Sequence, residues 1–422
     1  MGTDRTRRLL APAGLAVLAA SSLAIVAGAQ NDPNTLVPAA KLRYPDWLHG
    51  PLAWLELDLS TAGLAWLLLA MCAGYALVLA GRLPARAAVA AIVALHLLYM
   101  LAPPLLSSDV FGYVDSARLG TLHGIDPYSP ASTPLPDDDV LLYRRWGTDL
   151  PSPYGPLFVL LSYAFVPLGI GGAMWAFKVL LALASLGVVW LVWRCAAARG
   201  RDPVAAALFV GLNPLLLVYA VGGAHNDFLG VAAVMASVLA LTAGRTGRGG
   251  AALVAASAVK LPLGLPLLYA LARPRQDPRR LIAGAAAALA AVAAVSLAAF
   301  GTGIHRFLDA VRDQQDDVAI YSVPNQLGEL LGFGGITGGI RLVAAAGLLA
   351  AIAVTLRAAR RGGDWVTAAG WATFALIVSS AWLLPWYVVW LLPLAAVGSR
   401  RLRVAALALT VYIVLTRVEL WL

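Results

Sequence analysis

Long apolar segments separated by short basic loops recur from one end of the chain to the other. These segments run to roughly 17–24 residues, close to the length that a helix needs to cross a bilayer. Because backbone groups in lipid must pair within their own segment, we expect α-helices. The pattern predicts an all-α, polytopic membrane protein. Full spans are predicted at about 9–30, 57–80, 86–105, 173–193, 204–221, 227–243, 281–300, 340–356, 365–383, 386–398 and 404–421.

Two further apolar segments fit a full span less well. The segment at about 155–169 begins at Tyr154-Gly155-Pro156 and is short. The segment at about 249–272 carries Lys260 at its centre, followed by Pro262, Gly264 and Pro266. Interrupted membrane helices are tolerated where the freed backbone lines a cavity or is buried in protein. We expect both segments to enter and leave on the same side, which gives about 11–13 membrane helices in all.

The distribution of charge supports this threading. It puts 20 of the 31 basic residues and only four of the 22 acidic residues on one side. Basic loops mark the cytoplasmic side of a membrane protein. The long loops at about 107–153 and 301–339 are then outside, together with the polar segment at about 31–56. This predicts a multi-pass plasma-membrane protein with its long loops extracytoplasmic.

Composition agrees with a single membrane domain over residues 1–422. The chain is 60% apolar and 13% charged, with a mean hydropathy of +0.79, whereas a soluble domain carries about 25% charge. The net charge of +9 lies in the loops that set orientation, so we expect no nucleic-acid partner. Cys72 and Cys195 fall in or beside apolar spans and are expected to be packing residues. The first span, which follows Arg5, Arg7 and Arg8, is expected to be an uncleaved signal anchor.

Asp109 is the first candidate functional residue. It follows a long apolar stretch, and a carboxylate at that depth is costly unless it has a function. If 109–120 is a helix, Asp109, Tyr113 and Ser116 share one face, and Asp115 and Arg118 form an i,i+3 pair on another. A carboxylate there can act as a general base towards a hydroxyl. The nearby Tyr side chains, including Tyr128 and Tyr154, suit stacking against a sugar. The alternative is a helix cap with interfacial tyrosines.

The second candidate is the run His225-Asn226-Asp227, which lies between two spans on the outer side. It offers a base, an amide and a carboxylate in consecutive positions. Alternatively, Asn226 or Asp227 is the N-cap of the next helix. A metal would need a third ligand at suitable spacing, so we predict no metal site.

Lys260 is the third candidate. If its segment turns back within the membrane, Lys260 lies near the tip of the turn, towards the outside. An ammonium there can bind a lipid-linked phosphate as a point charge. The alternative is a structural ion pair with a carboxylate such as Asp58 or Asp227.

The remaining polar and aromatic groups are interpreted more simply. The second long loop, with His305, Arg306 and Asn325-Gln326, can supply hydrogen bonds to an oligosaccharide. Asp137-Asp138-Asp139 and Asp316-Asp317 are interpreted as solvated loop faces. The aromatic cluster around Pro385 is interpreted as mostly an interfacial belt whose outer end could floor a cavity. It comprises Trp382, Trp386, Tyr387 and Trp390.

Taken in order over about 90–400, these motifs resemble the membrane glycosyltransferases of the C superfamily (GT-C). The resemblance is to the actinobacterial polyprenyl-phosphate-mannose-dependent α-1,6-mannosyltransferases that build lipomannan-type cores. The motifs that carry it are Asp109…Tyr113, Gly124-Ile125-Asp126-Pro127-Tyr128, Tyr154-Gly155-Pro156, Asn213-Pro214, Gly223-Ala224-His225-Asn226-Asp227 and Lys260-Leu261-Pro262.

The resemblance implies a GT-C-like fold and transfer of a sugar, mannose first, from a polyprenyl phosphate to a glycan or glycolipid hydroxyl outside the cell, with inversion. Asp109 would be the catalytic base, with Asp115 in reserve. Lys260, with His225, would hold the leaving phosphate, and Asn226 and Asp227 would orient sugar hydroxyls or His225. Polyprenyl phosphate leaves readily, so we expect no cofactor and no metal.

Two alternatives remain open. One is a ligase that moves a whole lipid-linked glycan, and the other is a transporter or flippase of a lipid-linked sugar. A flippase predicts polar groups near the bilayer midplane and repeat-related broken helices. Here the polar groups cluster towards one face, and no internal repeat is visible.

Overall fold

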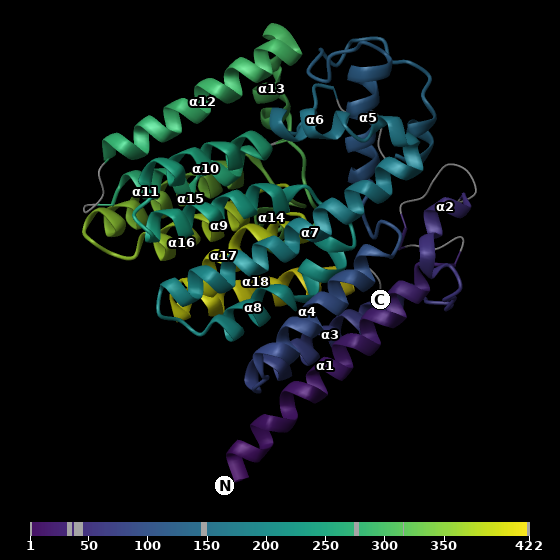
Figure 1. Cartoon of the computed structure of the whole chain (residues 1–422), viewed down its shortest axis with the longest axis vertical. Helices are drawn as coiled ribbons and strands as arrows, with labels where there is room; N and C mark the ends of the chain where they lie inside the picture. The colour runs from purple at the N-terminus through teal and green to yellow at the C-terminus, as the bar shows by residue number, and fades with distance from the viewer. Residues whose placement is uncertain are drawn as a thin grey trace.

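The computed structural model describes residues 2–31, 36–37, 45–144, 150–273, 278–314 and 316–419. This part of the chain consists of helices joined by loops and contains no β-strand, which confirms the all-α prediction. Figure 1 shows the long helices running beside one another, with α2 (Asp46–His49), α5 (Asp109–Leu122) and α6 (Pro156–Tyr163) gathered at one end, here called the α5 end. The bundle contains α1 (Gly2–Gly28), α3 (Thr61–Ala80), α4 (Ala85–Met100), α7 (Gly169–Ala198), α8 (Pro203–Gly211), α9 (Asp227–Thr242), α10 (Thr246–Val259), α11 (Pro266–Leu271), α12 (Pro278–Phe300), α15 (Gly338–Arg360), α16 (Trp365–Ser379), α17 (Val388–Val397) and α18 (Arg400–Glu419).

Five helical stretches in the described part of the chain are long and apolar enough to cross a membrane. They are Leu9–Gly28, Thr61–Ala80, Val166–Ala198, Pro278–Asp313 and Gly338–Arg360. Shorter apolar helices fill most of the other predicted spans. The span predicted at 204–221 is divided at Asn213-Pro214 into α8 and a π-helical turn, Leu216–Val221. Proline lacks the amide hydrogen that an unbroken helix needs at that position.

Helix α17 lies at the centre of the bundle. All ten of its residues are buried, and it packs against α7, α8, α9, α16 and α18. A helix that is apolar on every side is stable only when other elements surround it. By contrast, α12 and α15 are almost entirely exposed along their apolar lengths. These two helices therefore form flanks of the bundle that suit contact with lipid.

Arginine-bearing loops meet at the end opposite α5, here called the Arg-rich end. Nη2 of Arg199 lies 2.7 Å from a carboxylate oxygen of Asp364, and its Nε donates to the carbonyl of Val397. Arg273 lies over the ring of Trp365, and Arg403 lies near Arg201. The loops that follow α7, α11, α15 and α17 thus share one end, as the charge pattern predicted. The side chains of Arg5, Arg7, Arg8 and Arg275 lie outside the described residues.

The segment around Lys260 turns back on itself, as predicted. Helix α10 ends at Val259, and Lys260 has extended backbone angles (φ −152°, ψ 116°). A 3₁₀ turn (Leu261–Gly264) and the short α11 follow. Because the start of α12, at Arg280 and Leu281, packs against Gly247 and Gly250 at the start of α10, the chain returns to the level at which it entered. The bend is therefore the tip of a re-entrant segment, and the α5 end receives Lys260.

Helix α6 is eight residues long, too short to cross a membrane, and it lies beside α5 (Figure 1). Its start is tied to the Lys260 bend, because the amide of Gly155 donates to the carbonyl of Val259. A Cβ atom at Gly155 would overlap the carbonyl oxygen of Ala258, so only glycine allows this approach. The two interrupted segments therefore meet at the same end of the bundle.

Candidate active site

Four separate parts of the chain converge at the α5 end of the bundle. They are the start of α5, the turn 222–227 before α9, the Lys260 bend, and the segment Pro385–Trp390 that leads into α17. Each part is an interruption between membrane helices. Polar side chains can be placed there because backbone and side chains face protein rather than lipid.

Asp109 begins α5, and its amide donates to the hydroxyl of Ser107. Its carboxylate Oδ2 lies 3.3 Å from Nδ1 of His225, and the side chain is 34% exposed. Burial raises the pKa of Asp109, but the close contact and charge of His225, helped by Lys260 and Ser107, outweigh burial and bring the pKa below the usual value of 3.8. Asp109 is therefore an ionised carboxylate that a substrate can reach.

His225 is fully buried and is fixed between Asp109 and Trp386. Its ring stacks on the indole of Trp386 with the centroids 3.7 Å apart and the planes 17° apart. Within the described residues, neither ring nitrogen of His225 has a well-aligned hydrogen-bond partner, so the 3.3 Å approach of Nδ1 to Asp109 is an electrostatic contact. Ala224, just before it, adopts a left-handed conformation (φ 56°), which is costly for a residue other than glycine. The turn is thus held in one conformation that aims His225 at Asp109.

Lys260 and Asp227 form the second charged pair of the site, with Nζ 2.9 Å from Oδ1 and 3.0 Å from Oδ2. Asp227 is 0% exposed and also accepts a hydrogen bond from the indole of Trp390, whereas Lys260 is 19% exposed. The ammonium lies over the rings of Tyr387 and Trp390, at 5.2 and 5.4 Å from their centroids. The ion pair with Asp227, one of the two alternatives for Lys260, is thus formed, while part of the ammonium stays accessible.

Tyr113 connects α5 to the turn before α9. Its hydroxyl accepts a hydrogen bond from the backbone amide of Asn226 at 3.2 Å. Its ring meets that of Tyr154 edge-on, with the centroids 4.8 Å apart. The predicted helix over 109–120 is confirmed, and Asp109 and Tyr113 share the face that meets His225 and Asn226. Asn226 is buried, and neither the nitrogen nor the oxygen of its side-chain amide has a hydrogen-bond partner among the described residues.

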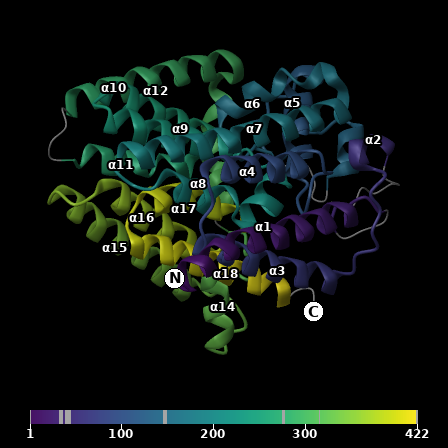
Figure 2. The ribbon, with the colours of Figure 1, turned by 60° about the horizontal axis from the view of Figure 1, so that its bottom comes forward.

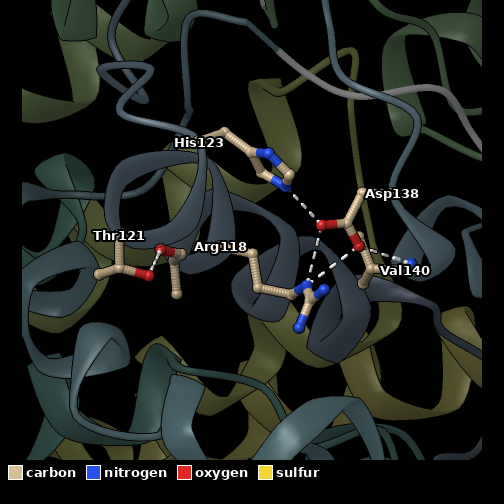
Figure 3. Close-up of polar contacts among 6 residues, drawn as sticks. Arg118, Thr121, His123, Asp138 and Val140 are labelled. Carbon is tan, nitrogen blue, oxygen red and sulfur yellow. Dashed lines mark hydrogen bonds and ion pairs between the residues drawn. The ribbon is translucent and has the colours of Figure 1, made fainter.

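The predicted pair between Asp115 and Arg118 is wrong. Arg118 contacts Asp138 instead, and Asp115 contacts Arg144, with both members of the second pair buried. Figure 3 shows Arg118 and His123 converging on the Asp138 carboxylate, which also accepts from the amide of Val140. Helix spacing allowed the i,i+3 pair, but the folded loop brought distant partners to both residues. Asp138 is therefore a clamp for the loop rather than part of a solvated face.

Tyr128 lies in a separate apolar cluster with Val159, Phe300 and Phe307. Its ring meets Phe300 edge-on, and its hydroxyl donates to the backbone carbonyl of Tyr154 at 2.7 Å. The structure therefore places Tyr128 behind Tyr154, as a support for the loop.

The aromatic residues after Pro385 belong to the site. Trp386, Tyr387 and Trp390 are all buried, so their interpretation as mostly an interfacial belt is wrong. Trp386 stacks on His225, and the stacked rings of Tyr387 and Trp390 cover the Lys260 ammonium. The spacing 386/390 places two indoles on one helical face, but the sequence does not say what that face meets.

Lys178, which was not identified from the sequence, has a structural role. It is fully buried in α7, and its ammonium donates to the carbonyls of Tyr99 and Gly222 at 2.7 and 2.8 Å. It ties the end of α4 to the turn that carries His225. Lysine within a membrane span was the available signal.

No three His, Cys, Asp or Glu side chains lie together as metal ligands in the part of the chain that the structure describes. Cys72 and Cys195 are free thiols. The ionisable groups of the site form two pairs, Asp109 with His225 and Lys260 with Asp227. One carboxylate is accessible and the other is enclosed.

The fold and site define a polytopic membrane protein with an accessible carboxylate and a partly accessible lysine at one end of its helix bundle. Comparison with known families matches residues 8–273 to the model described as Alpha-(1->6)-mannopyranosyltransferase, N-terminal domain, and residues 319–418 to the MptB C-terminal domain. The chain belongs to this α-(1→6)-mannopyranosyltransferase family.

Individual relatives agree with the family match. The chain is 30% identical over 341 residues to Alpha-(1->6)-mannopyranosyltransferase A of Mycobacterium tuberculosis, covering 73% of this chain and 65% of the relative. It is 28% identical over 348 residues to Alpha-(1->6)-mannopyranosyltransferase B of Corynebacterium glutamicum, covering 71% and 57%. The matches thus span less than two thirds of each relative's length. No solved structure matches the chain.

Proposed function

We propose that this protein is a membrane mannosyltransferase that moves mannose from a polyprenyl phosphate to a hydroxyl of a glycan or glycolipid acceptor, with inversion. The observation that carries the proposal is the presence of a partly exposed, ionised Asp109 and a partly exposed Lys260 at the same end of the bundle. Family membership supplies the sugar and the class of reaction. The donor, the acceptor and the roles of single residues are part of the proposal.

In the proposed reaction, the acceptor oxygen attacks the anomeric carbon while the bond from that carbon to the phosphate oxygen breaks. Asp109 takes the proton of the acceptor hydroxyl, and the bonding electron pair leaves with the polyprenyl phosphate. Because attack and departure occur on opposite faces of the sugar, a β-linked donor gives an α-linked product. In this proposal the ammonium of Lys260 stabilises the negative charge that grows on the leaving phosphate.

The other residues of the site have supporting roles in this proposal. His225 orients the Asp109 carboxylate and keeps it ionised. Asp227 holds Lys260 in place through their ion pair, and the indole of Trp390 fixes the Asp227 carboxylate by a hydrogen bond. The buried side-chain amide of Asn226 is assigned to a sugar hydroxyl, which would satisfy polar atoms that are costly to leave unpaired. The ring of Tyr154 is assigned to stacking against the sugar. Tyr113 and Tyr128 hold these groups in position.

The surroundings of Lys260 suit a lipid-linked donor. A small apolar hollow beneath it is lined by residues of α9, the 3₁₀ turn, α16 and α17, including Val231, Met235, Leu263, Thr373 and Leu394. The lipid-facing flanks α12 and α15 stand on either side of α11. These features support an approach of the isoprenoid chain from the bilayer with its phosphate towards Lys260.

The proposed orientation puts the Arg-rich end in the cytoplasm and the α5 end outside the cell, at the plasma membrane. Basic loops on one side of a membrane protein are the sign of the cytoplasmic side. A polyprenyl-phosphate sugar on the outer leaflet would then meet the site directly.

The test is sugar transfer by the purified, reconstituted protein. Radiolabelled polyprenyl-phosphate mannose and a short α-mannoside are supplied with and without EDTA, and wild type is compared with Asp109→Asn. The matched control is Asp309→Asn, an exposed aspartate whose ion pair with Arg312 lies on the surface of α13 (Arg306–Asp313).

We expect transfer that resists EDTA, is unaffected at Asp309 and falls ~100–10,000-fold at Asp109, the range of general-base catalysis. Wild-type protein that transfers no sugar from mannose or other polyprenyl-phosphate donors would overturn the proposed function. Near wild-type activity of Asp109→Asn would overturn the assignment of the base alone.

A further inference from the structure

Apolar side chains project from the second long loop where a polar surface was predicted. Helix α14 (Val323–Leu330) and the turn after it expose Leu327, Leu330, Leu331 and Phe333, with Leu330 84% and Phe333 61% exposed. Within 327–333 only Glu329 is charged. Figure 2 shows α14 projecting from the side of the bundle, away from the other helices. We call residues 327–333 the apolar finger.

Two polar residues of this loop, Ser322 and Asn325, face inward and hold the finger in shape. The side-chain amide of Asn325 donates to the carbonyl of Ile320 at 2.8 Å and accepts from the amide of Ile336 at 3.0 Å. The hydroxyl of Ser322 caps α14 by accepting from the amide of Asn325. Ser322 and Asn325 are both buried. Their use in backbone contacts corrects the prediction that Asn325 is available to an oligosaccharide, and it leaves the leucines and Phe333 outward.

The finger is continuous with a lipid-facing helix. Gly338, the start of α15, is five positions after Phe333, so the two lie within about 18 Å along the chain. Helix α15 is an apolar span that is almost unburied by protein, and Leu342 and Val343 near its start are exposed. Wherever α15 enters the bilayer, the finger must therefore lie at or close to the membrane surface.

The base of the finger is attached to the site. The amide of Ala319 donates to the carbonyl of Ala381, just before the segment that carries Trp386 and Tyr387, and the hydroxyl of Tyr412 donates to the carbonyl of Tyr321. The finger thus lies on the same end of the bundle as Asp109 and Lys260, projecting sideways from it (Figure 2).

We propose that the apolar finger inserts into the interface between headgroups and acyl chains of the leaflet at the α5 end. Apolar and aromatic residues on a short amphipathic helix favour that depth. Because the exposed apolar surface of α15 suits contact with lipid, the bilayer is the neighbour that the finger would meet. Insertion would fix the depth of the candidate site relative to the leaflet. It would also hold the segment that carries Trp386 and Tyr387 in position. This inference rests on the chain spanning a membrane and not on the identity of its donor or acceptor.

Site-directed spin labelling of the full chain in phosphatidylcholine–phosphatidylglycerol vesicles tests the proposal. Single cysteines replace Leu330 or Phe333 in a background in which Cys72 and Cys195 are alanine. The matched control replaces Asp309, which is exposed on α13 in the same long loop. Each label is probed by collision with oxygen, which concentrates in lipid, and with a water-soluble nickel chelate. Unchanged elution and thermal unfolding confirm that each variant is folded.

The expected result is a higher ratio of oxygen to nickel collisions at 330 and 333 than at 309. Equal access of nickel at all three positions would mean that the finger is in water and would overturn the proposal. Labels at 330 and 333 shielded from both reagents would also overturn it, because protein, such as a second copy of the chain, would then cover the finger. Either result would leave the proposed enzymatic function standing if transfer is still observed.

Discussion

At the scale of single residues, the two carboxylates of the site have different surroundings. Asp109 is accessible and contacts a histidine, whereas Asp227 is enclosed by a lysine and an indole. A carboxylate with no access to substrate can position its neighbours but cannot take a proton from an acceptor. The surroundings therefore support the proposed roles of Asp109 as the base and of Asp227 as the residue that holds Lys260.

The pH dependence of transfer should reflect the His225 contact. Burial raises the pKa of Asp109, but His225 and Lys260 more than offset burial, so the net shift is downward. The carboxylate should stay ionised from neutral pH down to the usual aspartate value of 3.8, and kcat/KM should show no acid limb from Asp109 in that range. In His225→Leu the contact that lowers the pKa of Asp109 is removed and burial remains, so the acid limb of the kcat/KM profile should move up into this pH range. Identical profiles for the two proteins would contradict the role of His225.

Lys260 has a structural and a proposed catalytic role, which one pair of variants separates. Lys260→Met leaves Asp227 buried with an uncompensated charge, which costs about 3–5 kcal/mol in known buried pairs. We expect a lower thermal unfolding temperature and no transfer. Adding Asp227→Asn removes the orphaned charge and should restore most of the stability. If Lys260 stabilises the leaving phosphate, transfer should stay low in the double variant, and recovery of transfer with stability would show that the lysine is structural only.

At the scale of elements, three of the interruptions at the α5 end lie beside a proline that starts a helix or a helical turn. Pro156 begins α6, Pro262 and Pro266 follow Lys260, and Pro385 precedes the segment with Trp386. Proline removes a backbone donor and restricts the residue before it. These breaks create helix ends inside the bundle, and the ends carry the polar side chains.

The contact between α6 and the Lys260 bend can be tested with two glycines. Gly155→Ala should force Tyr154 and the bend apart, because the new methyl group would overlap the backbone of Ala258 and Val259. Overpacking of this kind costs about 1–3 kcal/mol, and we expect lower stability and weaker transfer. The control is Gly187→Ala within α7, where a Cβ meets no atom within 4 Å. Equal stability and activity of the two variants would show that the contact is unimportant.

At the scale of the whole molecule, charge is divided between the two ends. Arginines gather at one end and the paired carboxylates at the other. The halves of the chain are interleaved, since α17, from the second family match, is surrounded by α7, α8 and α9 from the first. The site accordingly takes Asp109, His225 and Lys260 from one half and the covering aromatic rings from the other.

The proposed orientation predicts which end is open to reagents outside the cell. In the cysteine-free background, a membrane-impermeant thiol reagent added to intact cells should label Asp309→Cys and not Arg361→Cys, which is exposed at the end of α15. After the cells are opened, both positions should react. Labelling of position 361 alone in intact cells would reverse the orientation and the side of the proposed reaction.

The membrane class, most helix positions and three central residues of the candidate site could be predicted from the amino-acid pattern alone. Span length and loop charge depend on the bilayer, a solvent whose effects are local along the chain. The helix after Asp109 and the bend at Lys260 also follow from local pattern, through 3.6-residue spacing and proline. Local pattern was enough to mark Asp109, His225 and Lys260 because a polar group at the edge of a membrane span is costly.

Which side chains meet could not be predicted in this way. The structure answers that question. It paired Asp115 with Arg144 and Arg118 with Asp138, turned the aromatic cluster inward onto His225 and Lys260, and exposed the apolar finger. Each of the ion pairs and ring contacts joins residues from different segments of the chain. Its energy therefore depends on how the segments pack rather than on spacing along one helix. The amino-acid sequence shows which charged residues would lose free energy on burial. The packing of the bundle determines which partner compensates each buried charge.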